Sequence, residues 1–424
     1  MGACYDTGVI ERGEAESAAE TPNLRARAES FGALVRVENP PAIVAVDRVL
    51  AARLGVPHSP LWDGEPELSP RKFSGPVEVH LAVTQRCPAG CPGCYTGATP
   101  DAEHVPFAVL AARLDSLNRM GVFRVAFGGG EPMTHPDLPR LLEHGRALGL
   151  EITVTTSGIG LTAERAKGLG AAAQVNVSYD GLGETYRDVR GYDGEALALR
   201  AIEWLRAAGV PVGVNVVLAR ASFEGVLALA DRLRGLGVVE MQLLRYKPGG
   251  RANLDYLAKR LTREQVLRVP ELLRELVRRG GFAVRIDCSM VPFFSSDASV
   301  TAGSLTLFGV QGCEAGRALL TVDTGGGANP CSFWPAETRT AESRTGESSP
   351  MAEADPPSDW SNTPVLEACR DYPRTPPAPC DTCAIQSVCR GGCRVVSAQV
   401  SGNAFSPDPE CPRVIALSAT PSST

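Results

Sequence analysis

The chain has 424 residues, which is enough for two or three packed units rather than one small domain. Hydrophobic residues make up 44% and charged residues 21%, so most of the chain should bury a core. A formal net charge of −6 excludes a non-specific nucleic-acid binder, which needs a basic footprint. No apolar run reaches membrane-spanning length, and the first twenty residues carry acids where a signal peptide is apolar, so we expect a cytoplasmic protein without a membrane segment.

The N-terminal part is predicted to be a disordered tail followed by a small folded segment. Residues 1–23 are small, acidic and aperiodic, which is typical of disorder. Two β-like runs, ALVRV and AIVAV, flank the turn sequence ENPP and predict a hairpin, with a short helix over 47–54. We assign this hairpin and helix to a segment 24–66. Residues 56–76 contain five prolines and predict a linker.

A regular alternation of strands and helices is predicted over residues 77–290. Helical periodicity over 107–119, 136–148, 194–208, 223–236 and 263–279 separates seven apolar runs, which are VEVHLAV, FRVAF, ITVTT, VNVSY, VGVNVVL, MQLLRY and FAVRIDC. Continuous apolar strands between helices indicate a parallel sheet with crossover helices. Six or seven such units favour an α/β fold with a partial (β/α)6 barrel of the TIM type, and a doubly wound sheet is the alternative.

The C-terminal part, residues 305–412, is predicted to be a loop-rich domain with grouped cysteines. Its insertion 336–359 is rich in Ser, Glu and Pro and is predicted to be disordered, and residues 413–424 are predicted to be a tail. The whole chain has 13 cysteines. A disulfide framework is not expected in a cytosolic chain of this size, so the grouped cysteines indicate metal ligands.

The first cysteine group directly follows the first strand of the alternating region. Cys87, Cys91 and Cys94 have the spacing C-x3-C-x2-C. Three thiolates on one tight loop can hold three irons of a cubane [4Fe–4S] cluster and leave the fourth iron open to a substrate or cofactor. The alternative is a structural zinc site, for which His80 or His104 could supply the fourth ligand.

Polar or glycine-rich motifs follow the next three strands, and they indicate the kind of site. They are GGGEP at 128–132, TTSG at 155–158 and SYDG at 178–181. Barrel folds place their chemistry at the carboxyl ends of the strands. Behind the cysteine loop, this series resembles the radical S-adenosylmethionine (SAM) enzymes. In that family one electron from the cluster cleaves SAM, and the resulting 5′-deoxyadenosyl radical abstracts hydrogen from the substrate, while the protein positions the cofactor.

The resemblance implies which residues contact SAM. Gly129, Gly130 and Glu131 match the GGEP motif of the family, whose backbone groups hold the SAM amino group. Ser178 and Arg190 stand where related enzymes bind the SAM carboxylate, and the guanidinium fork suits a carboxylate. For Arg190 the alternative is an exposed surface charge.

One departure from the family pattern concerns the adenine of SAM. The family usually has an aromatic residue just before the third cysteine, packed beside the adenine, and here Gly93 occupies that position. Tyr95, which follows the third cysteine, is the residue that we expect to substitute for it.

The second cysteine group has seven members and predicts two metal centres, since seven are too many for one tetrahedral zinc. The pattern runs from Cys313 through Gly326-x4-Cys331 and Cys380-x2-Cys383-x5-Cys389-x3-Cys393 to Cys411. It resembles the SPASM extension, which carries two auxiliary [4Fe–4S] clusters in a subset of radical SAM enzymes. The resemblance implies an outer cluster on Cys380, Cys383, Cys389 and Cys411. It implies an inner cluster on Cys313, Cys331 and Cys393.

Three ligands leave the inner cluster with an open iron or with a further, unidentified ligand. Cys288 ends the last predicted strand and should face the mouth of the barrel. It has three interpretations: a packing residue, the fourth inner ligand, or a catalytic thiol that donates hydrogen to a product radical. Cys369 lies in a predicted short helix and is expected only to be buried.

SPASM-containing enzymes mostly modify peptides or proteins, so the resemblance implies a peptide-modifying oxidoreductase. The expected substrate is a ribosomally made precursor peptide that is crosslinked, oxidised or epimerised. The alternatives are a dehydrogenase of a small alcohol or sugar and an enzyme of the anaerobic sulfatase-maturing type. The least favoured alternative is an iron–sulfur electron carrier that catalyses no reaction. The implied cofactors are SAM and three [4Fe–4S] clusters, with a flavodoxin or ferredoxin-type reductant. Segment 24–66 either docks the precursor by strand addition or caps the barrel.

Overall fold

The computed structural model describes residues 24–38, 41–334, 360 and 363–419. The predicted disordered tail 1–23 and the predicted insertion 336–359 lie outside the described residues. The chain divides into two compact units, Met1–Leu68 and Ser69–Thr424. In the described part of the chain, no helix is both long and apolar enough to cross a membrane.

The first unit is a three-stranded antiparallel sheet with a short helix. The strands are β1 (Ala26–Glu29), β2 (Gly32–Glu38) and β3 (Pro41–Asp47) in the order β1-β2-β3, followed by α1 (Arg48–Arg53). The predicted hairpin and helix are therefore present, and β1 is an addition. The Asp47 carboxylate begins the helix by accepting from the backbone N–H of Leu50 at 2.7 Å.

The first residues of the predicted linker belong to this unit. The indole N–H of Trp62 donates to the carbonyls of Glu29 and Gly32, both at 2.9 Å. Arg48 donates to the carbonyl of Trp62 at 2.8 Å. The prolines of 56–76 predicted a linker, but the chain at Trp62 is hydrogen-bonded to the small sheet, in agreement with the bounds 24–66 assigned to the N-terminal segment.

The second unit is built on a nine-stranded sheet with the order β10-β9-β8-β7-β6-β5-β4-β11-β12. The seven strands β4 to β10 are parallel to one another. They lie side by side in the sheet in the same order in which they follow one another along the chain. They are β4 (Glu78–Thr84), β5 (Arg124–Gly129), β6 (Glu151–Thr156), β7 (Gln174–Ser178), β8 (Val212–Leu218), β9 (Glu240–Arg245) and β10 (Ala283–Ile286). All seven predicted strands are confirmed. Because the order never reverses, the doubly wound alternative is wrong and the fold is an open, partial barrel.

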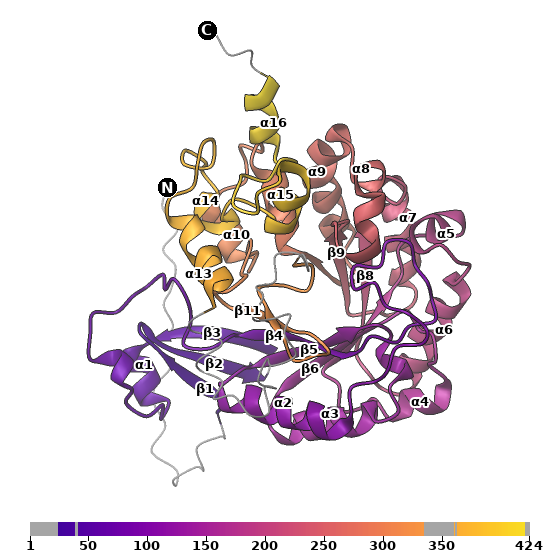
Figure 1. Cartoon of the computed structure of the whole chain (residues 1–424), viewed down its shortest axis with the longest axis horizontal. Coiled ribbons are helices and arrows are strands. Elements are labelled where there is room, and N and C mark those ends of the chain that lie inside the picture. Colours follow the sequence, from indigo (N-terminus) through magenta and orange to yellow (C-terminus); the bar gives the residue numbers. More distant parts are fainter. Residues whose placement is uncertain (1–23, 39–40, 335–359, 361–362, 420–424) are drawn as a thin grey trace, which may run out of the picture. The chain divides into compact units, whose positions relative to one another are not determined.

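The crossover helices cover one side of this sheet. Figure 1 shows α2, α3, α4 and α6 following one another along the outer side of the curved strands. The five predicted helices are confirmed, and α4, α5 and α8 are short additions. The helices are α2 (Phe107–Arg119), α3 (Leu138–Ala147), α4 (Ala163–Lys167), α5 (Glu184–Arg190), α6 (Glu195–Ala207), α7 (Val226–Arg234), α8 (Tyr256–Lys259) and α9 (Arg263–Arg279).

The strands bury one face more completely than the other. In β4, Val79, Leu81 and Val83 are fully buried in the core shared with the helices, while Glu78 and His80 on the opposite face are only half-buried. β6 alternates in the same way. The runs that looked continuously apolar thus leave a partly accessible inner face, toward which polar side chains point.

The C-terminal region joins the same sheet. β11 (Leu319–Val322) pairs in parallel with β4, and β12 (Ala328–Asn329) pairs antiparallel with β11. Five helices complete the described part of this region: α10 (Ala302–Leu307), α13 (Pro364–Asp371), α14 (Gln386–Cys389), α15 (Arg394–Ser401) and α16 (Pro412–Ala419). The residues predicted as a tail from 413 therefore begin as a helix.

Candidate functional site

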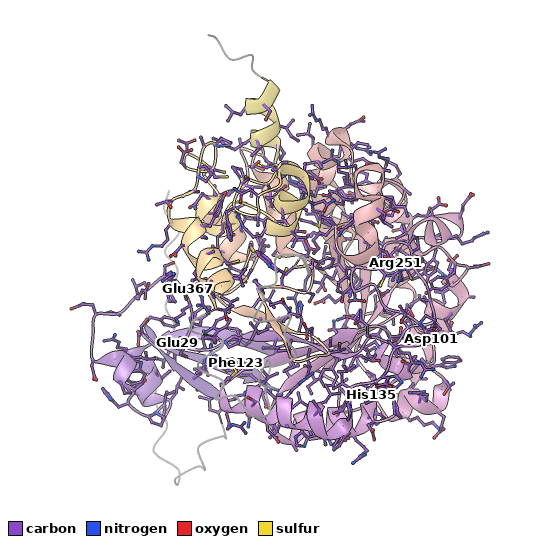
Figure 2. The ribbon with its side chains drawn as sticks, in the orientation of Figure 1. Glu29, Asp101, Phe123, His135, Arg251 and Glu367 are labelled. Carbon is purple, nitrogen blue, oxygen red and sulfur yellow. The ribbon has the colours of Figure 1, made fainter. Side chains whose placement is uncertain are left out.

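The first cysteine loop is held at the carboxyl end of β4 by hydrogen bonds at both of its ends. The N–H of Cys87 donates to the carbonyl of Thr99 at 2.8 Å. Arg251, labelled in Figure 2, donates from Nε to the carbonyl of Cys91 at 2.9 Å and from Nη1 to that of Ala98 at 2.8 Å. Arg251 lies shortly after β9, so a residue far along the sequence from the cysteine loop helps to fix the shape of that loop.

The three thiols of this loop lie close enough for their charges to act on one another. The pKa of Cys87 is raised to about 11, chiefly by burial and in part by the charges of Glu131, Cys91 and Cys94. Such thiols bind metal only as thiolates, so loading the site releases protons. Three soft sulfur donors on one loop fit the cluster implied by the sequence.

The zinc alternative loses one of its two candidate histidines, His80. Nδ1 of His80 lies 2.8 Å from the Ser332 hydroxyl, and its Nε2 lies 3.1 Å from the Glu78 carboxylate. Nδ1 of His104 lies 2.9 Å from the hydroxyl of Thr84. Both ring nitrogens of His80 are therefore engaged away from the cysteines.

The glycine motif lies directly on the chain that enters the cysteine loop. A Cβ atom on Gly129 would stand 2.1 Å from the carbonyl oxygen of Thr84, and one on Gly130 would stand 2.2 Å from that of Arg86. The N–H of Gly130 donates to Thr84 at 2.7 Å, and that of Glu131 donates to Arg86 at 2.8 Å. Only glycine permits this approach. An amino group donates hydrogen bonds, so only the carbonyls of the motif could accept from it, and that of Gly129 already accepts from the Thr96 hydroxyl at 3.3 Å.

The Glu131 side chain joins two strand ends. Its carboxylate, 2% exposed, accepts from the Thr156 hydroxyl at 2.7 Å and from the N–H of Met133 at 3.0 Å. It also accepts from the N–H and the hydroxyl of Ser157, at 2.7 and 2.6 Å. Burial raises the pKa of this carboxyl, and the hydrogen bonds oppose that rise. Glu131 thus ties the end of β5 to the end of β6 with its side chain.

Arg190 is not a surface charge, so that alternative is wrong. Its side chain is 18% exposed and forms an ion pair with Asp180, which also accepts from the N–H of Val217 at 2.7 Å. Burial raises the pKa of Cys91, and the Arg190 guanidinium opposes this rise with its positive charge. Ser178 is buried at the end of β7. The structure therefore brings Arg190 beside the cysteine loop.

The aromatic residue beside Gly93 is Tyr246, from the end of β9, and not Tyr95. A Cβ atom on Gly93 would lie 3.0 Å from Cε2 of Tyr246, so the tyrosine ring fills the space of a side chain there. The Tyr246 hydroxyl donates to Asp255 at 2.7 Å. The Tyr95 ring stacks instead on Phe333, with ring centres 4.4 Å apart.

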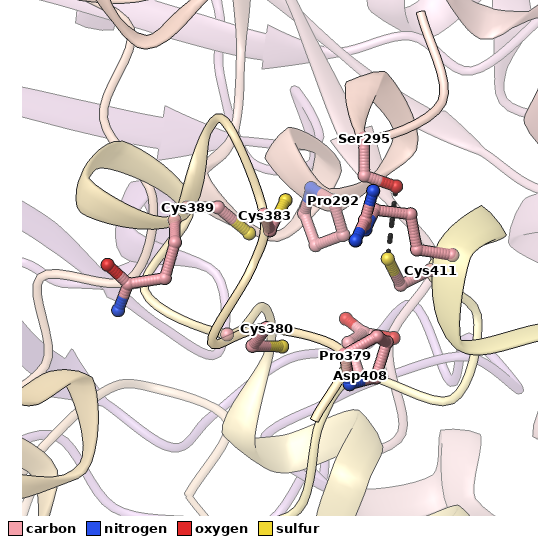
Figure 3. Close-up of a pocket in the computed structure, with 11 residues that line it drawn as sticks. Pro292, Ser295, Pro379, Cys380, Cys383, Cys389, Asp408 and Cys411 are labelled. Carbon is pink, nitrogen blue, oxygen red and sulfur yellow. Dashed lines mark hydrogen bonds between the residues drawn. The ribbon is translucent and has the colours of Figure 1, made fainter. Parts of the chain in front are cut away.

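Four cysteines predicted for the outer cluster line one cavity. Cys380, Cys383, Cys389 and Cys411 line it, and Figure 3 shows their sulfur atoms around it. The Ser295 hydroxyl lies 3.1 Å from the Cys411 sulfur. Four soft donors around such a space fit an iron–sulfur cluster.

The three cysteines predicted for the inner cluster also pack close to one another. Cys331 packs against the apolar cluster that contains Cys393, and Cys313 and Cys331 both pack against the cluster that contains Cys369. The pKa of Cys331 is raised to about 12, chiefly by burial and in part by the charges of Cys393 and Cys313. Cys369 is buried, as predicted, but it lies close to this group.

Cys288 lies just after the carboxyl end of β10. Burial raises its pKa, and the charges of Asp287 and Cys313 add to the rise. Asp287 forms an ion pair with Lys247, whose Nζ lies 4.3 Å from the centre of the Phe333 ring. The sequence KPGGR at 247–251 is a further polar, glycine-rich motif at a strand end. The rule that identified the other strand-end motifs would have identified Lys247 and Arg251 as well.

The comparisons with known proteins agree with this geometry. Residues 81–233 match the radical SAM superfamily. PqqA peptide cyclase of Streptomyces rochei is 27% identical over 349 residues, which are 79% of this chain and 89% of the relative. Mycofactocin maturase MftC of Mycobacterium ulcerans is 28% identical, over 80% of this chain and 88% of the relative. Streptococcus suis SuiB, solved bound to precursor peptide SuiA, has a TM-score of 0.72 at 17% identity, over 92% of this chain and 98% of SuiB, which shows the fold.

Proposed function

We propose that this chain, which belongs to the radical SAM superfamily, modifies a ribosomally made precursor peptide with a SAM-derived radical. The proposal rests on the meeting of the cysteine loop, the glycine motif and Arg190 at one end of the sheet. The relatives support the choice of substrate, because PqqA peptide cyclase and SuiB both carry the name of a peptide that they act on or bind.

The residues at this end of the sheet have separate tasks. When bound, the cluster and SAM supply a 5′-deoxyadenosyl radical that takes a hydrogen atom from the substrate. Cys87, Cys91 and Cys94 bind the irons. Arg190, oriented by Asp180, binds the SAM carboxylate through its guanidinium. The carbonyls of the glycine motif accept from the SAM amino group.

The C-terminal region is a SPASM-type domain with two auxiliary [4Fe–4S] clusters in this proposal. The cavity lined by four cysteines supports the outer cluster, and the packing of Cys331 with Cys313 and Cys393 supports the inner one. Their task is to relay electrons away from the substrate radical. A flavodoxin or ferredoxin-type protein in the cytoplasm is the reductant that we expect.

SAM cleavage tests the enzyme class. Reconstituted protein, kept anaerobic and given SAM and dithionite, should form 5′-deoxyadenosine, measured by liquid chromatography. A protein that holds its clusters and leaves SAM intact under these conditions would be an electron carrier and not an enzyme.

Cys288 is the fourth ligand of the inner cluster in this proposal. It follows β10 and lies close enough to Cys313 and Cys393 for their charges to act on its thiol. The Lys247–Asp287 ion pair stands beside it and holds the backbone at the strand end. Two inner cysteines are among the neighbours of Cys288, which favours a cluster ligand over a thiol that donates hydrogen to a product radical.

Replacing Cys288 by alanine should change the inner cluster without stopping SAM cleavage. We expect a lower iron content and an altered electron paramagnetic resonance (EPR) spectrum. Cys369→Ala is the matched control, because Cys369 is buried against the same group yet is assigned to packing. Iron loss in Cys369→Ala with none in Cys288→Ala would reverse the assignment. Intact clusters with lost peptide turnover in Cys288→Ala would favour the hydrogen donor.

The first unit docks the precursor in this proposal. β3 is an edge strand of the three-stranded sheet, and an extended peptide can pair with such an edge. The side chain of Val44 on this strand is 37% exposed, and that of Val49 on α1 is 63% exposed. An open edge with apolar side chains beside it suits a peptide with alternating apolar residues.

Replacing Val44 by glutamate should weaken precursor binding at least tenfold, because a charge would face the apolar side chains of the peptide. Fluorescence anisotropy with a labelled precursor measures the affinity. Val239→Glu, an exposed valine of the second unit, is the control and should bind normally. Equal affinities for both variants and the parent protein would leave this unit as a cap.

A further inference from the structure

A buried ion pair lies between the barrel and the cysteine-rich region. Arg245, the last residue of β9, donates to both carboxylate oxygens of Asp408, at 2.6 and 3.0 Å. The two side chains are each 1% exposed. Arg245 also donates to Glu410 at 2.8 Å, and Arg260 donates to Glu410 at 3.1 Å. Two guanidinium groups thus balance two carboxylates, which is how proteins retain buried charge.

Asp408 contacts both groups of auxiliary cysteines. Its Oδ2 accepts from the N–H of Cys393, an inner cysteine, at 2.9 Å. Its backbone carbonyl accepts from the N–H of Cys411, an outer cysteine, at 3.0 Å. Its side chain also lines the outer cavity, where Figure 3 labels it among the cysteines. One residue therefore fixes the backbone of a ligand at each site.

The charge of Asp408 also reaches sulfurs of both sites. Burial is the largest cause of the raised pKa values of Cys389, Cys393 and Cys411. The negative charge of Asp408 adds to the rise at all three thiols. The Asp408 carboxylate accepts from the Cys393 N–H and lines the outer cavity, and negative charge so close to a cluster disfavours its reduced form, which carries one more electron.

We propose that Asp408 is a positioning residue shared by the two auxiliary clusters, and that its charge, balanced by Arg245, lowers the reduction potentials of both together. This inference rests on the proposed function, because it needs two loaded sites.

Asp408→Asn tests the shared role. The variant loses one negative charge and leaves Arg245 unbalanced, so both auxiliary potentials should shift in the positive direction. An EPR-monitored redox titration of the full-length, reconstituted protein measures each potential. Glu410→Gln is the matched control, since Glu410 contacts Arg245 but its carboxylate binds no cysteine amide. Its two auxiliary potentials should stay near those of the parent protein.

The double variant Arg245→Gln with Asp408→Asn guards against misfolding caused by an unpaired buried charge. It removes one charge of each sign, so both potentials should shift less than in Asp408→Asn. A shift at one cluster only, no shift at either, or an equal shift in Glu410→Gln would overturn the shared role. A parent protein that holds only one cluster would contradict the proposed cluster content, which iron analysis reports separately.

Discussion

Replacing Cys87, Cys91 and Cys94 together by alanine should abolish SAM cleavage while the other clusters remain. In the proposed function this loop supplies all three protein ligands of the first site, and the cysteines of the C-terminal region bind the other clusters. Iron content should fall by about a third, since one of three four-iron clusters is lost. Iron analysis and the yield of 5′-deoxyadenosine check the two parts of this result.

The matched variant for this experiment is Cys380→Ala with Cys383→Ala, which removes two ligands from the outer cavity. It should lose a similar share of iron and still cleave SAM. If the triple variant at the first loop retained SAM cleavage, the assignment of that loop as the catalytic site would be wrong.

Replacing Glu131 by alanine should destabilise the protein by about 3 kcal/mol or more. The carboxylate accepts four hydrogen bonds from groups at the ends of β5 and β6, and its loss leaves buried donors without this acceptor. Urea unfolding should show a lower midpoint with an unchanged slope. SAM affinity should fall as well, because the glycine motif loses its attachment to β6.

Glu131→Gln is the comparison for this prediction. The amide keeps one acceptor oxygen and should recover part of the lost stability. A Glu131→Ala variant within about 0.5 kcal/mol of the parent protein, as for an ordinary surface substitution, would show that these hydrogen bonds do not hold the two strand ends together.

The strands and the clustered cysteines could be predicted because both have a local signature. Runs of apolar residues and fixed cysteine spacings can be identified in the sequence without knowledge of the tertiary contacts. The strand-end rule also placed the glycine motif and Ser178 correctly at the carboxyl ends of their strands.

The contacts that a local pattern cannot show are those between distant residues. Gly93 departs from the family pattern because Tyr246, from another strand, fills its space. No motif in the sequence singles out Asp408, and only the fold brings it to Arg245 and to the N–H of Cys393. Trp62 lies among prolines that predicted a linker, yet its indole completes the small N-terminal sheet.

Peptide modification is tested most directly by high-resolution mass spectrometry. Reconstituted protein is incubated anaerobically with SAM, a reductant and any short peptide encoded beside its gene. The proposed function predicts SAM-dependent loss of two hydrogens from that peptide, located by fragmentation, or deuterium uptake in heavy water if the reaction is an epimerisation. Cleaved SAM together with a peptide that shows neither change would contradict it and would favour a small-molecule substrate.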